Sequence, residues 1–136
     1  MGDHYLDKDE FGRWIKNAKR TLESAKSDQV AEFYNWACFK AQQSAEFALK
    51  AFMRGTGSPS FGRSVSAMTQ QIGFSKEFME MAKSLDKYYI PTRYTDVWPE
   101  GIPDDYYTMV DAENTIKIAE SIIDEVMRRW NSLKKE

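Results

Sequence analysis

The residues of this sequence best suited to chemistry lie in one irregular stretch, residues 88–107 (YYIPTRYTDVWPEGIPDDYY). It holds three of the four prolines, which exclude a continuous helix, and five of the seven tyrosines. Arg93 stands between Tyr89 and Tyr94, and Asp96 follows. A guanidinium group matches a phosphate, and aromatic rings can stack on a base. The stretch is therefore a candidate nucleotide site; the alternative, that Arg93 pairs with Asp96 or a carboxylate of the second helix and pins the loop, stays open on chemistry alone.

A second group of polar side chains interrupts the longest helical stretch, residues 30–53. Apolar and small residues recur there every three or four positions on more than one side, which is typical of a helix in the middle of a bundle. Lys40, Gln43 and Lys50 could line the nucleotide pocket. We expect either a polar pocket or subunit interface, or a row that drifts to solvent with lysine stems lying along apolar surface.

Other catalytic chemistry finds little support in the sequence. The one histidine, His4, stands in the N-terminal lead-in, where we expect an exposed tail residue. There is no HExxH or ExxH pair, no phosphate-binding glycine loop, and no histidine for a Ser-His-Asp or Cys-His arrangement. We therefore predict no catalytic residue, no metal ion and no cofactor.

The bulk composition predicts one globular domain, spanning residues 1–136 with residues 1–8 as a loose lead-in. The sequence is 42% hydrophobic and 29% charged, and its net charge of −2 offers no general attraction for nucleic acid. No apolar run approaches the roughly 20 residues of a membrane span, and the N-terminus lacks a secretory signal. The single cysteine, Cys38, is expected in the core, and a reducing cytoplasm fits it.

Five helices must position the candidate residues, and no segment is typical of a strand. Apolar spacing and capping residues predict helices at about 9–25, 30–54, 64–71, 75–87 and 108–134. Ser27-Asp28 is expected to link the first two helices, and Gly55 to end the second in a left-handed conformation. The predicted fold class is all-α, an antiparallel up-and-down bundle of four or five helices.

Two separated motifs give the sequence a resemblance to a known family. The run WACFKAQQSAEFALKAFM resembles the central helix of HEPN domains (higher-eukaryote and prokaryote nucleotide-binding domains). The matching residues there are Phe39, Gln42, Gln43, Ala45, Glu46, Ala48, Leu49, Lys50 and Ala51. The later loop is similar to the stand-alone prokaryotic branch at Tyr89, Pro91, Arg93, Tyr94, Asp96, Tyr106, Asp111 and Ala112.

The resemblance implies a homodimeric helical bundle that works with a nucleotidyltransferase-fold partner, often as a toxin–antitoxin pair. Some relatives are metal-independent RNases that use an arginine and a histidine five to seven residues later. Here those positions after Arg93 are Trp98, Pro99 and Glu100. Three hypotheses follow: a nucleotide- or RNA-end-binding module, an RNase with an altered site, and a purely structural dimerisation module that uses Trp36 and Phe39.

Overall fold

The computed structural model describes residues 5–59 and 64–134, so His4 lies outside the described residues. The helices are α1 (Lys8–Val30), α2 (Tyr34–Gly55), α3 (Val65–Ile72), α4 (Lys76–Asp86) and α5 (Met109–Lys134). Two short 3-10 turns, η1 (Thr95–Val97) and η2 (Pro103–Tyr106), lie between α4 and α5. The predicted all-α helical bundle is confirmed, and the described part of the chain contains no strand.

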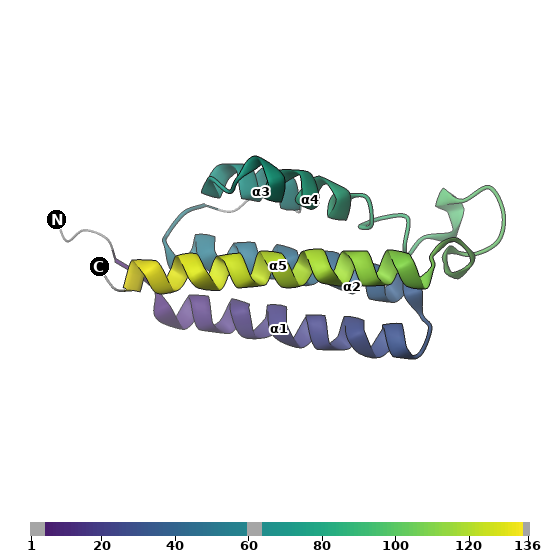
Figure 1. The fold of residues 1–136 in the computed structure, drawn as a ribbon, viewed down its shortest axis with the longest axis horizontal. Helices are drawn as coiled ribbons and strands as arrows, with labels where there is room; N and C mark the ends of the chain where they lie inside the picture. The colour runs from purple at the N-terminus through teal and green to yellow at the C-terminus, as the bar shows by residue number, and fades with distance from the viewer. Residues whose placement is uncertain (1–4, 60–63, 135–136) are drawn as a thin grey trace.

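The three long helices, α1, α2 and α5, run side by side, and the short pair α3 and α4 covers one side of them (Figure 1). Residues 88–107 lie at the end of the bundle where α1 turns into α2 and where α5 begins. Within residues 5–59 and 64–134, no helix combines the length and apolar character that crossing a membrane requires.

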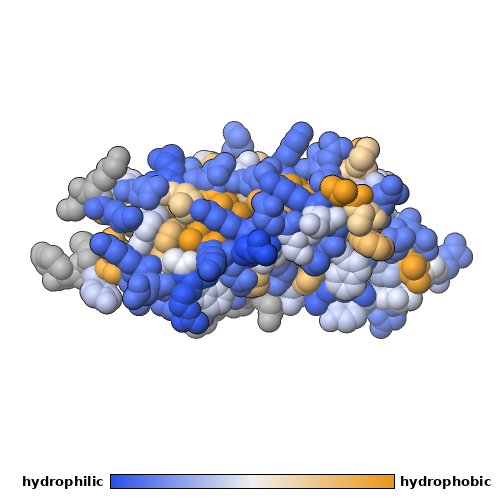
Figure 2. Space-filling view, turned by 90° about the horizontal axis from the view of Figure 1, so that it is seen from below, coloured by the Kyte–Doolittle hydropathy of each residue, from blue (hydrophilic) through white to orange (hydrophobic). Residues whose placement is uncertain are grey.

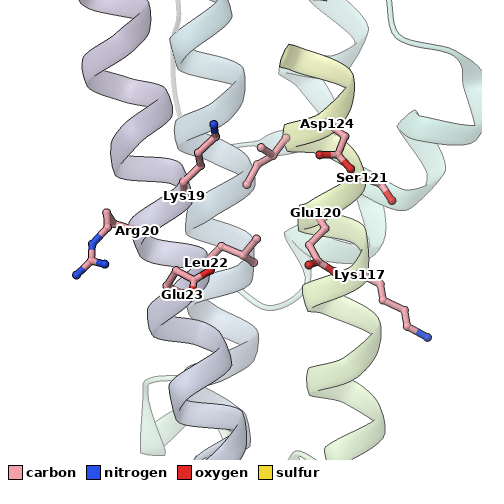
Figure 3. A pocket seen from close by; sticks show the side chains of 9 residues that line it. Lys19, Arg20, Leu22, Glu23, Lys117, Glu120, Ser121 and Asp124 are labelled. Atoms are coloured by element: carbon pink, nitrogen blue, oxygen red, sulfur yellow. The ribbon is translucent and has the colours of Figure 1, made fainter. Parts of the chain in front are cut away.

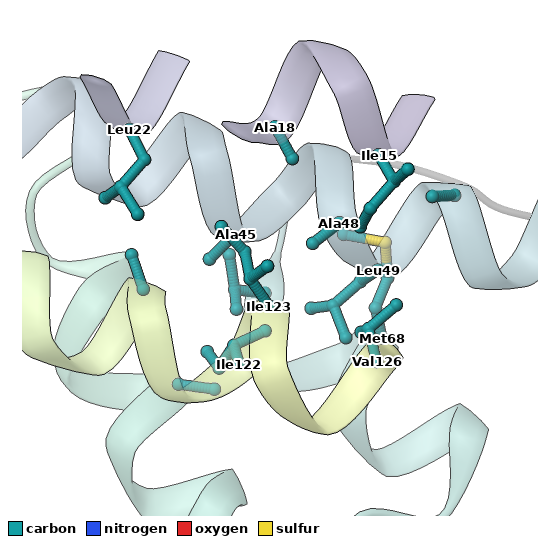
Figure 4. Packing of buried hydrophobic residues seen from close by; sticks show 14 of the residues in the cluster. Ile15, Ala18, Leu22, Ala45, Ala48, Leu49, Met68, Ile122, Ile123 and Val126 are labelled. Atoms are coloured by element: carbon teal, nitrogen blue, oxygen red, sulfur yellow. The ribbon is translucent and has the colours of Figure 1, made fainter. Parts of the chain in front are cut away.

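The core is built on the small residues of α2. Ala41, Ala45 and Ala48 are fully buried, and such short side chains let neighbouring helices approach closely. Figure 4 shows larger side chains from α1, α3 and α5 filling the space around them. These larger residues include Ile15, Leu22, Met68, Ile122, Ile123 and Val126.

The predicted boundaries of the last three helices are confirmed to within one residue. Ser64 and Ser75 cap α3 and α4, each accepting a backbone N–H three residues on. At the start of α5, the Thr108 backbone N–H donates to Asp111 at 2.9 Å, and the Asp111 N–H donates to Thr108 Oγ1 at 3.2 Å. These reciprocal bonds form a capping-box arrangement.

The predicted boundary between the first two helices is wrong. The structure continues α1 to Val30, so residues 27–28 lie inside this helix rather than linking it to the next. Val30 itself is 85% exposed, although the sequence placed it on the buried row of the second helix. That row begins only inside α2, where Ala37 is fully buried.

The turn after α1 explains the error, because it uses a residue that gives no sequence signal. Glu32 takes the left-handed conformation at φ 68°, and its N–H donates to the Gln29 carbonyl at 3.1 Å. The Phe33 N–H donates to the Asp28 carbonyl at 2.8 Å, which completes a Schellman motif. Glycine or asparagine normally fills the left-handed position, so a glutamate there conceals the helix end.

The end of α2 also differs from the prediction. Gly55 remains inside the helix, and the left-handed residue is Gly57 at φ 78°. A Cβ at Gly55 would lie 2.7 Å from the Trp130 ring and 3.0 Å from Phe11. These two rings stack with centroids 4.1 Å apart, so Gly55 permits close packing rather than a turn.

Candidate functional site

Arg93 lies at the centre of a cage of three aromatic rings. Its Cζ is 4.3 Å from the Phe39 centroid, 4.6 Å from Tyr89 and 4.9 Å from Tyr94. The Arg93 Nε also donates to the Tyr89 carbonyl at 3.0 Å. Each ring attracts the cation through its negative face, so the cage orients the guanidinium group. Tyr89 and Tyr94 come from the predicted loop, whereas Phe39 comes from α2.

The described residues offer Arg93 no carboxylate partner. Neither Asp96 nor any acidic residue of α2 lies within ion-pair distance of the guanidinium group, so the predicted carboxylate pair is wrong, although the Nε bond to the Tyr89 carbonyl still ties Arg93 to its own loop. The Arg93 side chain is partly buried, and its two terminal nitrogens find no acceptor in the described chain. Tyr94, on the outer side of the cage, is 49% exposed.

Two residues that the sequence reasoning missed fix the loop beneath Arg93. Asn35 Nδ2 donates to the Thr92 carbonyl at 3.0 Å, and Thr92 Oγ1 donates to the Tyr88 carbonyl at 2.7 Å. Both side chains are buried, although asparagine and threonine are mostly exposed. Asn35 interrupts an apolar run at the start of α2, and that interruption was the only signal in the sequence.

The outer part of the loop packs on itself. Trp98 Nε1 donates to the Pro91 carbonyl at 2.8 Å, and the Trp98 ring stacks on Tyr106 with centroids 3.9 Å apart. The Tyr106 hydroxyl in turn donates to the Glu100 carbonyl at 2.5 Å. Trp98 and Glu100 stand five and seven residues after Arg93, at two of the positions where the RNase pattern implied by the resemblance needs a histidine, and Trp98 serves here as a structural anchor.

The predicted pocket residues on α2 are tied to other partners. Lys40 reaches α1, where it pairs with Asp28 at 2.8 Å and donates to Ser24 at 2.9 Å. Lys50 pairs with Glu46 at 3.0 Å. Neither lysine makes a described contact with Arg93.

The polar side chains in the middle of α2 are mostly hydrogen-bonded within the bundle rather than solvated. Gln43 donates to Gln42 at 2.8 Å and to Glu46 at 3.3 Å. Ser44 is fully buried and donates to the Ala18 carbonyl of α1 at 2.8 Å. Gln42 and Glu46 are also almost fully buried, so polar groups on two sides of α2 are held within the bundle.

A small satellite core supports the base of the loop. Tyr88 and Tyr107 pack against Cys38 and Ala112, with the tyrosine centroids 5.8 Å apart. Burial raises the pKa of the Cys38 thiol to about 12, so the thiol stays protonated and unreactive at neutral pH. Burial, reinforced by the nearby Asp111 carboxylate, likewise raises the pKa of Tyr88 to about 12.

A groove of about 680 Å³ lies elsewhere, between α1 and α5 (Figure 3). Leu22 and Ile123 line it, and its rim carries both charge signs, with Lys19, Arg20 and Lys117 beside Glu23, Glu120 and Asp124. No aromatic side chain lines the groove, so it offers no stacking surface for a base. Within the described part of the chain, no three His, Cys, Asp or Glu side chains converge to hold a metal ion.

Comparisons with known proteins agree with both motifs of the sequence. Residues 11–130 match the HEPN domain family. The fold is similar to the crystal structure of TT1696 from Thermus thermophilus, with a TM-score of 0.83 and 35% identity over 87% of this chain and 96% of that one. It is also similar to ST0689, an archaeal HEPN homologue, with a TM-score of 0.78 and 37% identity over 88% and 96% of the two chains.

A third similar structure is an HEPN domain protein from Thermotoga maritima, with a TM-score of 0.72 and 34% identity over 88% of this chain and 98% of that one. No curated protein matches the sequence.

Proposed function

Because the chain belongs to the HEPN domain family, we propose that it is a non-catalytic domain that binds a nucleotide or an RNA end at Arg93. The observation that carries the proposal is the Arg93 cage, in which three rings and one carbonyl orient a cation whose terminal donors remain available. The terminal N–H groups would bind phosphate, and the exposed face of Tyr94 would stack on the base.

The proposal includes a partner protein of the nucleotidyltransferase fold, in a toxin–antitoxin type of system. The support is the similarity to stand-alone HEPN proteins, together with the missing histidine after Arg93. A domain that only holds a nucleotide or RNA end needs a second protein to perform chemistry on it. Co-expression with a nucleotidyltransferase-fold protein encoded in the same genome tests this part, and failure to form a stable complex would count against it.

The RNase alternative finds less support in the site. The family mechanism requires a histidine after the arginine, whereas Trp98 at one such position uses its ring nitrogen on the Pro91 carbonyl. RNA cleavage without metal that disappears in Arg93→Ala would reverse this preference.

Calorimetric titration with ATP, GTP, UTP and a short RNA tests the nucleotide site. We expect saturable binding of at least one ligand by the wild type and at least about tenfold weaker binding by Arg93→Ala, because a charge-assisted bidentate contact is lost. Arg54→Ala is the matched control, since Arg54 lies 4.6 Å from the Trp14 ring but away from the loop. Equal losses in both variants, or no heat with any ligand, would contradict the proposal.

A further inference from the structure

The exposed apolar side chains are concentrated at one end of the molecule. Of ten large hydrophobic residues exposed in the described chain, all but Tyr5 fall within residues 30–36 and 90–110. They are Val30, Phe33, Trp36, Ile90, Tyr94, Val97, Ile102, Met109 and Val110. Residues 30–36 and 88–110, which we call the loop end, lie together at the end of the bundle in Figure 1, and apolar atoms reach its surface in Figure 2.

The loop end presents these side chains on a fixed scaffold. Asn35 and Thr92 anchor the loop to α2, and Trp98 stacks on Tyr106. The Ile102 N–H donates to the Asp105 carboxylate at 2.9 Å, which fixes the start of η2. Concentrated apolar exposure on an ordered surface marks an interaction site rather than a loosely packed loop.

The charges of the loop end have one dominant sign. Its only basic residue is Arg93, which lies within the aromatic cage, whereas its five acidic residues are all exposed. They are Glu32, Asp96, Glu100, Asp104 and Asp105. Apart from Asp105, none of these carboxylates has a hydrogen-bond or ion-pair partner among the described residues. The rest of the chain therefore carries a net positive charge, since the whole sequence has a net charge of only −2.

We infer that the loop end docks a partner protein whose contact surface combines apolar side chains with lysine and arginine. This inference deepens the partner half of the proposed function and does not depend on the nucleotide half. A polynucleotide lying across the whole loop end is a poor occupant, because every phosphate beyond the one held at Arg93 would meet the exposed carboxylates. A second copy is also a poor occupant, because a two-fold contact would place this acidic surface against itself.

The probe is an amphipathic helical peptide of leucine and lysine, whose binding is measured by fluorescence anisotropy. The corresponding peptide of leucine and glutamate is the comparison. The loop-end variant is Asp96→Asn with Glu100→Gln and Asp104→Asn. The control variant, Glu23→Gln with Glu77→Gln and Asp124→Asn, changes the net charge equally at exposed positions elsewhere.

We expect only the lysine peptide to bind, and to bind the loop-end variant about tenfold more weakly, with less than about a twofold change in the control. Val97→Ser with Ile102→Ser should also weaken binding, whereas Tyr5→Ser, at the exposed site outside the loop end, should not. Equal losses in both charge variants would mean that binding reflects general acidity, and would overturn the inference.

Two further readouts separate the competing occupants. Light scattering without peptide that shows a wild-type dimer broken by Val97→Ser with Ile102→Ser would assign the surface to a second copy and overturn the inference. Displacement of the peptide by a short RNA from Arg93→Ala, in which the nucleotide site is removed, would do the same in favour of RNA. Arg93→Ala should retain peptide binding, so failure of the nucleotide site and failure of the docking surface give different results.

Discussion

Two glycines show how the surroundings of a residue decide the effect of the same chemical change. A Cβ added at Gly12 would have no atom within 4 Å, whereas one added at Gly55 would lie against Trp130 and Phe11. We expect Gly12→Ala to raise the free energy of unfolding by about 0.5–1 kcal/mol, because alanine is the better helix former. Gly55→Ala should lower it by roughly 1–3 kcal/mol through overpacking. Urea denaturation of both variants measures the two changes in the free energy of unfolding. If both changes had the same sign, the packing described around Gly55 would be contradicted.

Tyr88 makes the protein sensitive to alkaline pH. Its pKa is raised to about 12 in the folded protein, against about 10 in an unfolded chain. Between these values the unfolded state binds fewer protons, so the free energy of unfolding falls as pH rises from about 10 to 12. Tyr88→Phe removes this titration and should give a shallower fall. Denaturation of both proteins at pH 8 and at several pH values up to 12 tests this prediction. If the free energies of unfolding of wild type and Tyr88→Phe fall in parallel with pH, Tyr88 is not the titrating group.

The Arg93 cage could be predicted only in part. Tyr89 and Tyr94 lie close to Arg93 in the sequence, so chemistry alone placed them together. Phe39 was expected only in the central-helix motif and in a possible dimer contact, because nothing local connects it with a loop more than fifty residues later. The roles of Asn35 and Thr92 were not predicted for the same reason, because a hydrogen bond between distant segments leaves no periodic pattern in the sequence.

At the scale of the elements, apolar periodicity located all five helices, because burial of one face determines where a helix packs. The errors occurred at helix ends, where local backbone conformation decides. Gly73 at φ 94° ends α3 where a glycine signalled it, whereas Glu32 ends α1 without such a signal. The polar row of α2 was also left undecided, since its partners lie on α1 and within α2 itself.

The α1 terminus gives a prediction at this scale. A left-handed conformation costs a non-glycine residue roughly 1 kcal/mol or more, and Glu32 is exposed and has no described side-chain partner. We expect Glu32→Gly to raise the free energy of unfolding by about 0.5–1 kcal/mol, partly offset by the greater freedom of glycine in the unfolded chain. Glu32→Ala is the control, because it removes the charge and retains the strain. If Glu32→Ala unfolds at a higher temperature than Glu32→Gly, the left-handed turn geometry at residue 32 is contradicted.

The whole molecule divides its surface between a charged bundle and an apolar, acidic loop end. Near the sequence pI of about 5.5 the net repulsion between molecules vanishes, and the apolar, acidic loop end of one molecule can then associate with the net positive bundle of another rather than with a second loop end. We expect light scattering to rise as pH falls from 7.5 towards 5.5. Val97→Ser with Ile102→Ser should delay this rise, whereas Tyr5→Ser should not. A rise that is the same in all three proteins would place the association elsewhere.

The loop end lies far from the two places where the chain enters and leaves the helical bundle. α1 begins and α5 ends at the same end of the bundle, and residues 88–107 lie at the other (Figure 1). A tether or fusion joined before α1 or after α5 would therefore hold the domain with its loop end facing outward. Whether the domain is mounted on a sensor chip or carried at the tip of a longer assembly, the same architecture turns Arg93 and its apolar surroundings towards whatever approaches from solution.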